Sequence, residues 1–128
     1  MKKNVVIFID NNASTLQLFK DYFYDLNTKK IFFTSAKEFF IWKNNNKIDC
    51  KFIIISDYNM SDINGLELFQ KIDFHVNAKI LLSNTTYSKE ISDALKNRDI
   101  DEYLQKDDTN SFEKLENIIN KYLLSSFI

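Results

Sequence analysis

The sequence predicts an α/β protein in which helices cover both faces of a doubly wound, five-stranded parallel sheet. Short apolar runs alternate five times with longer stretches in which apolar residues recur at helical spacing, and this alternation is typical of strand–helix units. The runs 5–9 (VVIFI) and 52–55 (FIII) are continuously apolar, as expected of strands that are buried on both faces. Parallel strands joined through helices require right-handed crossovers.

The five predicted strands share a short run of apolar residues with a polar end. They cover 5–9, 31–33, 52–55, 79–82 and 101–105. The last run (DEYLQ) is more polar than the others, so we expect it nearer an edge of the sheet.

The five predicted helices share apolar residues at intervals of three or four positions. They cover 14–26, the stretch that begins at 35–38, 64–72, 88–96 and 111–124. Ser14 is the predicted N-cap of the first helix, and residues 35–38 (SAKE) have the spacing of a capping box. The third helix begins at the turn pair Asn64–Gly65, which contains the only glycine of the chain.

The size and charge of the chain limit its organisation and partners. Its 128 residues suffice for one domain over 1–128 and are too few for two. A net charge of −1 provides no field that would attract nucleic acid or an anionic membrane. No apolar run approaches the roughly 18 residues of a spanning helix, and the stretch before Asp10 is too brief for a secretory signal. We therefore expect a cytoplasmic protein.

Composition also disfavours several kinds of site. With one cysteine, Cys50, an internal disulfide is impossible. With one histidine, His75, a histidine-based metal site or a Ser-His-Asp triad is disfavoured. A single glycine cannot form a glycine-rich phosphate loop, so the chain has neither a P-loop nor a dinucleotide fingerprint.

Polar residues stand at the ends of four predicted strands. They are Asp10 with Asn11, Asp57, Ser83 and Lys106. Because parallel strands point their carboxyl ends to one edge of the sheet, where such sheets bind ligands, we expect these residues to meet in one crevice. Carboxylate and amide oxygens suit Mg²⁺, and an ammonium group and a hydroxyl suit a phosphoryl group that an aspartate can accept. The pattern predicts a hard-cation site beside a phosphoryl site.

Residues 55–60 (ISDYNM) and 64–68 (NGLEL) are similar to motifs of the chemotaxis-type response-regulator receiver domain, and the resemblance covers almost the whole chain. The resemblance implies a flavodoxin-like fold with strand order 2-1-3-4-5. It also implies phosphorylation of an aspartate by a histidine kinase, Mg²⁺ as cofactor, and a signalling protein that is not an enzyme.

Carried over position by position, the resemblance implies a role for each of seven residues. Asp57 is the phospho-acceptor; Asp10, Asn11, Asp57 and the backbone carbonyl of Asn59 bind the metal; Ser83 and Lys106 bind the phosphoryl group; Tyr103 is the aromatic switch. A competing register places Ile9 and Asp10 at the two metal positions after the first strand. We prefer the first register because Leu16 and Leu18 then match helix leucines of the family.

Four positions depart from the family motifs near the acceptor. Asn11 replaces an acid. One unit-charge pair at roughly 4 Å and an effective dielectric near 20 is worth about 4 kcal/mol before hydration is counted, so we predict weakened Mg²⁺ binding and slower phosphorylation, not their loss. Ser61 replaces a proline and loosens its turn, and Asn64 replaces an aspartate and still suits a turn. Asn84 replaces a small residue and narrows access to the phosphoryl group.

A fifth departure follows the lysine. Asp107 stands where the family has a proline after a cis bond. A cis bond without proline costs about 2.5–4 kcal/mol, so we predict a trans Lys106–Asp107 bond and a displaced loop that changes the aim of Lys106. Asp107 and Asp108 are also expected to compete for the ammonium group of Lys106.

Three functions follow from these observations. In the first, the protein is a stand-alone receiver in phosphorelay signalling, and the charge added at Asp57 alters the last helix–strand–helix face, which binds a separate output protein. In the second, it is a pseudo-receiver that binds proteins and has lost efficient phosphorylation because of Asn11. In the third, it binds a flavin or nucleotide, which the missing glycine loop disfavours. None of the three involves nucleic acid or a membrane.

Overall fold

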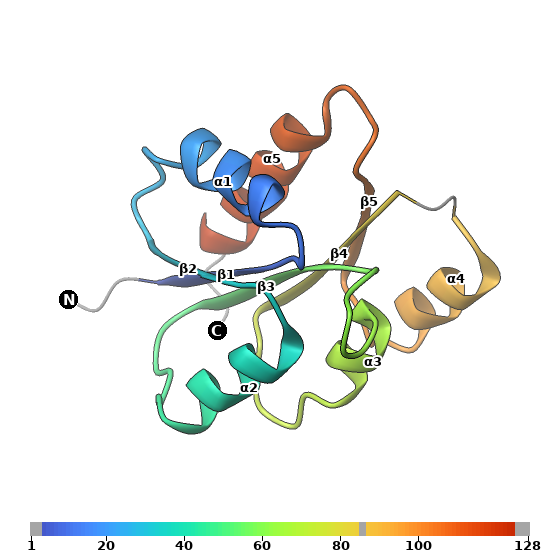
Figure 1. Ribbon diagram of the computed structural model, residues 1–128, viewed down its shortest axis with the longest axis horizontal. Helices are drawn as coiled ribbons and strands as arrows, with labels where there is room; N and C mark the ends of the chain where they lie inside the picture. Colours follow the sequence, from blue (N-terminus) through green and yellow to red (C-terminus); the bar gives the residue numbers. More distant parts are fainter. Residues whose placement is uncertain (1–3, 85–86, 125–128) are drawn as a thin grey trace.

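The computed structural model describes residues 4–84 and 87–124, which form a five-stranded parallel sheet between two layers of helices (Figure 1). The strand order is β2-β1-β3-β4-β5 and every neighbouring pair is parallel, so the predicted flavodoxin-like, doubly wound fold is confirmed. The elements are, in chain order, β1 (Val5–Ile9), α1 (Ala13–Tyr22), β2 (Lys29–Phe33), α2 (Ala36–Asn44), β3 (Phe52–Asp57), α3 (Gly65–Gln70), β4 (Ala78–Ser83), α4 (Lys89–Lys96), β5 (Glu102–Gln105) and α5 (Ser111–Leu124).

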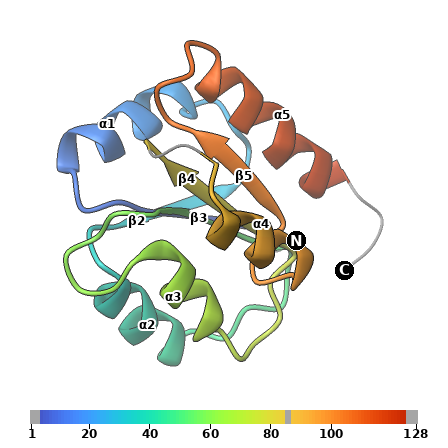
Figure 2. The same cartoon turned by 90° about the vertical axis from the view of Figure 1, so that its right-hand side faces the viewer.

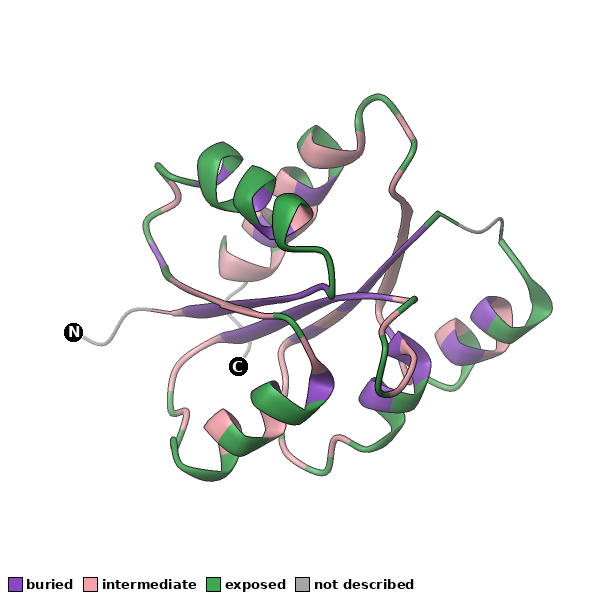
Figure 3. Ribbon diagram, in the orientation of Figure 1, coloured by how far each residue is buried: buried purple, intermediate pink, exposed green. Residues whose placement is uncertain are grey.

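The helices divide between the two faces of the sheet. α1 and α5 cover one face, and α2, α3 and α4 cover the other, as Figures 1 and 2 show. We call these the α1/α5 face and the α2–α4 face. Each face has its own apolar cluster, which contains Phe19 and Leu115 on the α1/α5 face and Phe39 and Ile91 on the α2–α4 face. The central strands between the two clusters are buried along their length (Figure 3).

Alternation along each strand decides which face a side chain takes. In β1, Val6 and Phe8 pack into the cluster of the α1/α5 face, whereas Ile7 and Ile9 pack into the cluster of the α2–α4 face. In β3, Ile55 is paired with Phe8 in the ladder and belongs to the same cluster. Side chains two positions apart along a strand therefore point to the same face of the sheet.

The edge strand predicted from its polar composition is present. β5 lies at one edge of the sheet, next to β4, and all of its residues are half-buried. β2 forms the other edge and is also less buried than the central strands. Within residues 4–84 and 87–124, no helix is both long and apolar enough to cross a membrane.

The predicted start of the first helix is wrong. The N-cap of α1 is Asn12, whose side-chain oxygen accepts the N–H of Thr15 at 3.1 Å. Ser14 instead lies within the first turn, because Asn12 already binds the amide that a cap must satisfy. The helix also ends at Tyr22, before the predicted Leu26.

The predicted N-cap of α2 is confirmed, but only half of the capping box forms. The Ser35 hydroxyl accepts the N–H of Glu38 at 3.1 Å. The Glu38 carboxylate accepts hydrogen bonds from the hydroxyl groups of Thr34 and Ser35. It does not accept one from the backbone N–H of Ser35, as a full capping box requires. The cap therefore satisfies one amide of the helix start.

The complete capping box occurs in α3. The Asn64 side chain accepts the N–H of Glu67 at 2.8 Å, and the Glu67 carboxylate accepts the N–H of Asn64 at 3.2 Å. The N–H of Gly65 donates to the carbonyl of Tyr58 at 2.8 Å. The start of α3 is thus attached to the chain just after β3, at the edge of the sheet where the predicted site lies.

Candidate functional site

Two carboxylates stand side by side at the carboxyl edge of the sheet. Asp10 lies two positions after Phe8, and Asp57 lies two positions after Ile55. Phe8 and Ile55 are paired in the ladder and face α1 and α5, so both aspartates are expected on that face. Both carboxylates are buried: Asp10 is 1% exposed and Asp57 is 6% exposed.

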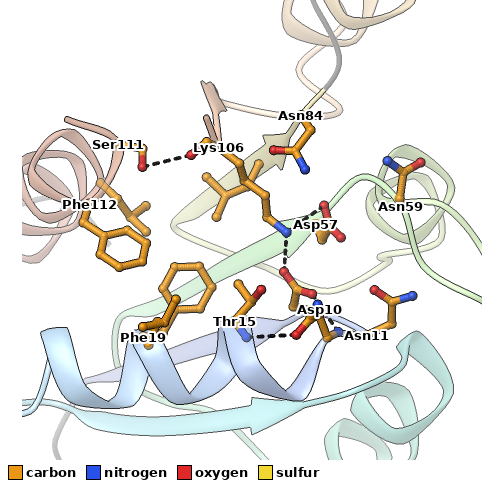
Figure 4. Close-up of a pocket in the computed structure, with 14 residues that line it drawn as sticks. Asp10, Asn11, Thr15, Phe19, Asp57, Asn59, Asn84, Lys106, Ser111 and Phe112 are labelled. Atoms are coloured by element: carbon orange, nitrogen blue, oxygen red, sulfur yellow. Dashed lines mark hydrogen bonds and ion pairs between the residues drawn. The ribbon is translucent and has the colours of Figure 1, made fainter. Parts of the chain in front are cut away.

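The ammonium group of Lys106 joins these two carboxylates. Its Nζ lies 2.5 Å from Oδ2 of Asp10 and 3.2 Å from Oδ1 of Asp57 (Figure 4). Lys106 follows β5, and its side chain is 17% exposed. Ion pairs that are mostly buried are screened weakly by water and salt, so the three groups are strongly coupled. The structure thus brings together residues that are far apart in the sequence.

Asp10 is held in place from its own loop as well. Its Oδ1 accepts the N–H of Asn12 at 2.9 Å. Asn11, between them, is exposed and lines the same cavity as Asp10. Ile9 is buried in the cluster on the α2–α4 face, so the first metal position of the competing register holds an apolar core side chain. Asp10 is therefore the one carboxylate that the loop after β1 supplies.

Burial is the main influence on the pKa of Asp57, the phospho-acceptor predicted from the sequence. It raises the pKa of the Asp57 carboxyl, because removal from water disfavours the charged form. The Lys106 ammonium lowers that pKa and the Asp10 carboxylate raises it, and the balance of all contributions lies above the ordinary value. The ion pair with Lys106 is thus what favours the charged form of Asp57 most strongly.

A cavity of about 430 Å³ opens over these residues. It is lined by Asp10, Asn11, Asn12, Thr15, Leu18, Phe19, Asp57, Asn59, Leu82, Asn84, Lys106, Ser111, Phe112 and Leu115. In Figure 4 the side chain of Lys106 crosses the cavity, with Asn59 and Asn84 on one side and Phe19 and Phe112 on the other. Five of the seven predicted site residues line the cavity: Asp10, Asn11, Asp57, Asn59 and Lys106.

The other two predicted residues do not line the cavity. Ser83 is fully buried, and its carbonyl accepts the N–H of Lys106 at 2.8 Å. It lies two positions after Leu81, which packs into the cluster on the α2–α4 face, so alternation assigns Ser83 to that face. Tyr103 also packs against that cluster, and its ring contacts the ring of Tyr87 with centroids 5.9 Å apart.

Sequence reasoning missed three polar residues of the cavity wall, Asn12, Thr15 and Ser111. Asn12 and Thr15 belong to the start of α1, and Ser111 is the first residue of α5. Both helices begin at the carboxyl edge of the sheet, because every helix here follows a strand. These three residues could have been predicted from the sequence, because the first turn of a helix that follows a parallel strand lies at the edge of the sheet where ligands bind.

The side chains around the aspartates are oxygen donors of the kind that Mg²⁺ prefers. Two carboxylates, those of Asp10 and Asp57, line one cavity together with Asn11 and Asn59, whose amide and backbone oxygens are also hard donors. Within residues 4–84 and 87–124, however, no three His, Cys, Asp or Glu side chains are grouped so that they could hold a metal ion. The oxygen ligands are therefore of the kind that a hard cation binds, but they include only two negatively charged groups.

The peptide bond after the lysine is trans, as predicted, since the described residues contain no cis bond. The Nζ of Lys106 nevertheless reaches both carboxylates, so the expected change in its aim does not remove it from the site. Asp108 does not take this ammonium group, because its carboxylate pairs with Lys114 at 2.5 Å.

The loop that carries Asn59 is anchored at Asp62. The Asp62 carboxylate accepts the N–H of Lys37, at the start of α2, at 2.9 Å. Burial tends to raise the pKa of Asp62, but hydrogen bonds from backbone N–H groups, that of Lys37 first, lower it below the ordinary value. This contact holds the loop at a point next to Ser61, where the sequence lacks the proline of the family motif.

Comparisons with known proteins identify the fold. No family model matches the chain, and no curated protein matches it. Among solved structures, it resembles the signal receiver domain of an HD domain-containing protein from Pseudomonas fluorescens Pf-5, with 19% identity, a TM-score of 0.80, and 95% of each chain covered.

Two further structures agree. A two-component response regulator from Clostridium difficile has 21% identity and a TM-score of 0.79, with 94% of this chain and 96% of that chain covered. A response regulator receiver domain protein from Clostridium thermocellum has 21% identity and a TM-score of 0.76, with 94% of each chain covered. The chain thus has the fold of response-regulator receiver domains, and the predicted resemblance is confirmed at the level of the fold.

Proposed function

We propose that this chain is a phosphorylatable receiver domain that accepts a phosphoryl group on Asp57 from the phosphohistidine of a kinase. One observation carries the proposal: the Lys106 ammonium lies between the carboxylates of Asp10 and Asp57 in an open cavity at the carboxyl edge of the sheet. The receiver fold of the chain supports the same reading.

In the proposed reaction, an oxygen of the ionised Asp57 carboxylate attacks the phosphorus of phosphohistidine. The new P–O bond forms as the P–N bond breaks, and the departing imidazole takes up a proton from solvent. Lys106 already lies beside Asp57, so its positive charge would offset the negative charge of the transferred oxygens.

We further propose that Mg²⁺ takes part through the carboxylates of Asp10 and Asp57, the Asn11 amide oxygen and the Asn59 backbone carbonyl. Mg²⁺ would supply positive charge against the incoming phosphoryl group. Because Asn11 is neutral and Lys106 already pairs with both carboxylates, we expect the chain to hold this ion weakly.

We propose that the face formed by α4, β5 and α5 binds a separate output protein after phosphorylation. Tyr103 lies on this face as the proposed aromatic switch. It is half-buried and packs against Tyr87, which is 58% exposed just before α4. We expect signalling in the cytoplasm, with no turnover of a separate substrate, no nucleic acid and no membrane.

The proposal is tested by intact mass after incubation with phosphoramidate and Mg²⁺. The unmodified chain should gain one phosphoryl group, and Asp57→Asn should gain none. Asp25→Asn, which removes an exposed acid that does not line the cavity, should be phosphorylated like the unmodified chain. If neither phosphoramidate nor acetyl phosphate produced a gain, the proposal would fail and the predicted pseudo-receiver would replace it.

A further inference from the structure

We propose that the side-chain amide of Asn84 donates the neutral hydrogen bond to the phosphoryl group on Asp57, in the role that sequence resemblance assigns to Ser83. This inference rests on the proposed function, because it concerns the group that Asp57 would carry.

The first support is the alternation of side chains along β4. Ile80 and Leu82 pack into the cluster on the α1/α5 face, and Asn84 follows Leu82 by two positions. Asp57 is paired with Leu82 in the ladder between β3 and β4. Asn84 is the first residue after β4, and continuing the alternation of the strand puts it on the face of Asp57, two positions beyond the ladder partner of Asp57.

Alternation places Ser83 on the opposite face. Its neighbour in the ladder is Gln105, and the N–H of Lys106 donates to the Ser83 carbonyl at 2.8 Å. The backbone of Ser83 is thus held in the sheet by β5. The Ser83 hydroxyl would have to leave its buried position to reach the cavity, whereas Asn84 already lines it.

The cavity gives an independent second support. Asn84 is exposed and lines the cavity together with Asp57 and Lys106, whereas Ser83 is fully buried and is not part of the lining. In Figure 4 the Asn84 amide lies on the cavity wall near Asp57 and Lys106. A phosphoryl group on Asp57 would enter the same space.

The chemistry of the amide suits this role. The side-chain nitrogen of Asn84 offers two N–H donors, and a phosphoryl group presents charged oxygens as acceptors. Hydrogen bonds to charged acceptors are stronger than those between neutral groups, so loss of this donor should weaken phosphoryl binding roughly tenfold. Lys106 would supply positive charge to the phosphoryl oxygens, and Asn84 would donate a neutral, directional hydrogen bond to one of them.

Beryllofluoride, which mimics a phosphoryl group on aspartate, provides the test. Its affinity is measured in the presence of Mg²⁺ by ¹⁹F NMR for four proteins: the unmodified chain, Asn84→Ala, Asn84→Gln and Ser83→Ala. We expect Asn84→Ala to bind roughly tenfold more weakly and to shift the bound fluorine resonance. We expect Asn84→Gln to recover part of the affinity, and Ser83→Ala to stay within about twofold of the unmodified chain.

The outcomes separate this inference from the proposed function. If Asn84→Ala keeps full affinity, or if Ser83→Ala loses as much, the inference is overturned while the proposed function stands. If the unmodified chain binds no beryllofluoride and also gains no phosphoryl group, both fail together. Asn84 is exposed, so its variants should unfold at the same urea concentration as the unmodified chain, which excludes a loss of fold as the cause.

Discussion

Gly65 packs directly against the backbone of Asp57. A Cβ at position 65 would lie 2.5 Å from the Asp57 carbonyl oxygen and 2.7 Å from Cδ1 of Leu81. The φ angle of Gly65 is not positive, so the close approach requires glycine here and the backbone conformation does not. The only glycine of the chain thus lets the start of α3 lie against the strand that carries the proposed acceptor.

We predict that Gly65→Ala destabilises the protein by about 1–3 kcal/mol, because the added methyl group would displace the end of β3. The sign is diagnostic, since alanine inside a helix is normally more stable than glycine by roughly 0.5–1 kcal/mol. Urea unfolding measures the difference. Gln70→Ala, an exposed change in the same helix, should stay within about 0.5 kcal/mol of the unmodified chain. A stabilising Gly65→Ala would contradict the close packing.

Lys106→Ala should destabilise the protein by about 3 kcal/mol, because it leaves the buried carboxylates of Asp10 and Asp57 without their shared partner. Lys114→Ala is the matched control. It removes an ion pair with Asp108 whose side chains are 50% and 35% exposed, and it should cost less than about 1 kcal/mol. Equal losses in the two variants would show that the Lys106 pair gains nothing from burial.

Asp57→Asn should stabilise the protein at neutral pH. Burial raises the pKa of Asp57 above 3.8, so the folded state binds this proton more tightly than the unfolded state. The stability contributed by Asp57 is therefore full below pH 3.8 and is lost as the pH rises through the folded pKa. The gain in thermal midpoint should be largest near neutral pH and should vanish below that value.

The control for this pH dependence has the opposite sign. The hydrogen bond from Lys89 lowers the pKa of Asp93, so Asp93→Asn removes stability that is present at neutral pH and lost as the pH falls. Thermal unfolding over a pH series measures both variants. If Asp57→Asn behaves like Asp93→Asn, burial does not dominate at Asp57.

Asn11→Asp should raise the affinity for Mg²⁺ roughly tenfold or more, because it adds a carboxylate to a cavity that contains two. Isothermal titration with Mg²⁺ measures the change. Asn97→Asp adds the same charge at the end of α4 and should leave the affinity within about twofold. An unchanged affinity in Asn11→Asp would mean that residue 11 does not contribute to the metal site.

Much of the fold could be predicted because the clearest sequence patterns, the continuous apolar runs, correspond to the most deeply buried strands. The runs ending at Ile9 and Ile55 are continuously apolar because both sides of those strands are buried. The helix starts were harder to predict. Asn12 and Ser14 are both good caps, and only the path of the chain after β1 decides which side chain reaches an amide.

The site divides in the same way. Asp10, Asp57 and Lys106 meet because parallel strands carry them to one edge, which topology alone predicts. The sequence could not show whether Ser83 or Asn84 points toward Asp57. Adjacent residues of a strand face opposite sides, and the exact end of the strand was not known. Only the structure shows that Asn84 lines the cavity with Asp57 and that Ser83 is buried away from it.

Identifying the phosphorylated carboxylate tests the whole account. After reaction with phosphoramidate and Mg²⁺, borohydride reduces an aspartyl phosphate to homoserine, and peptide mass spectrometry locates the modified position. The account predicts reduction at Asp57 and none at Asp10, although the same ammonium group of Lys106 pairs with both. Reduction at Asp10, at an exposed acid such as Asp107, or at no position would contradict it.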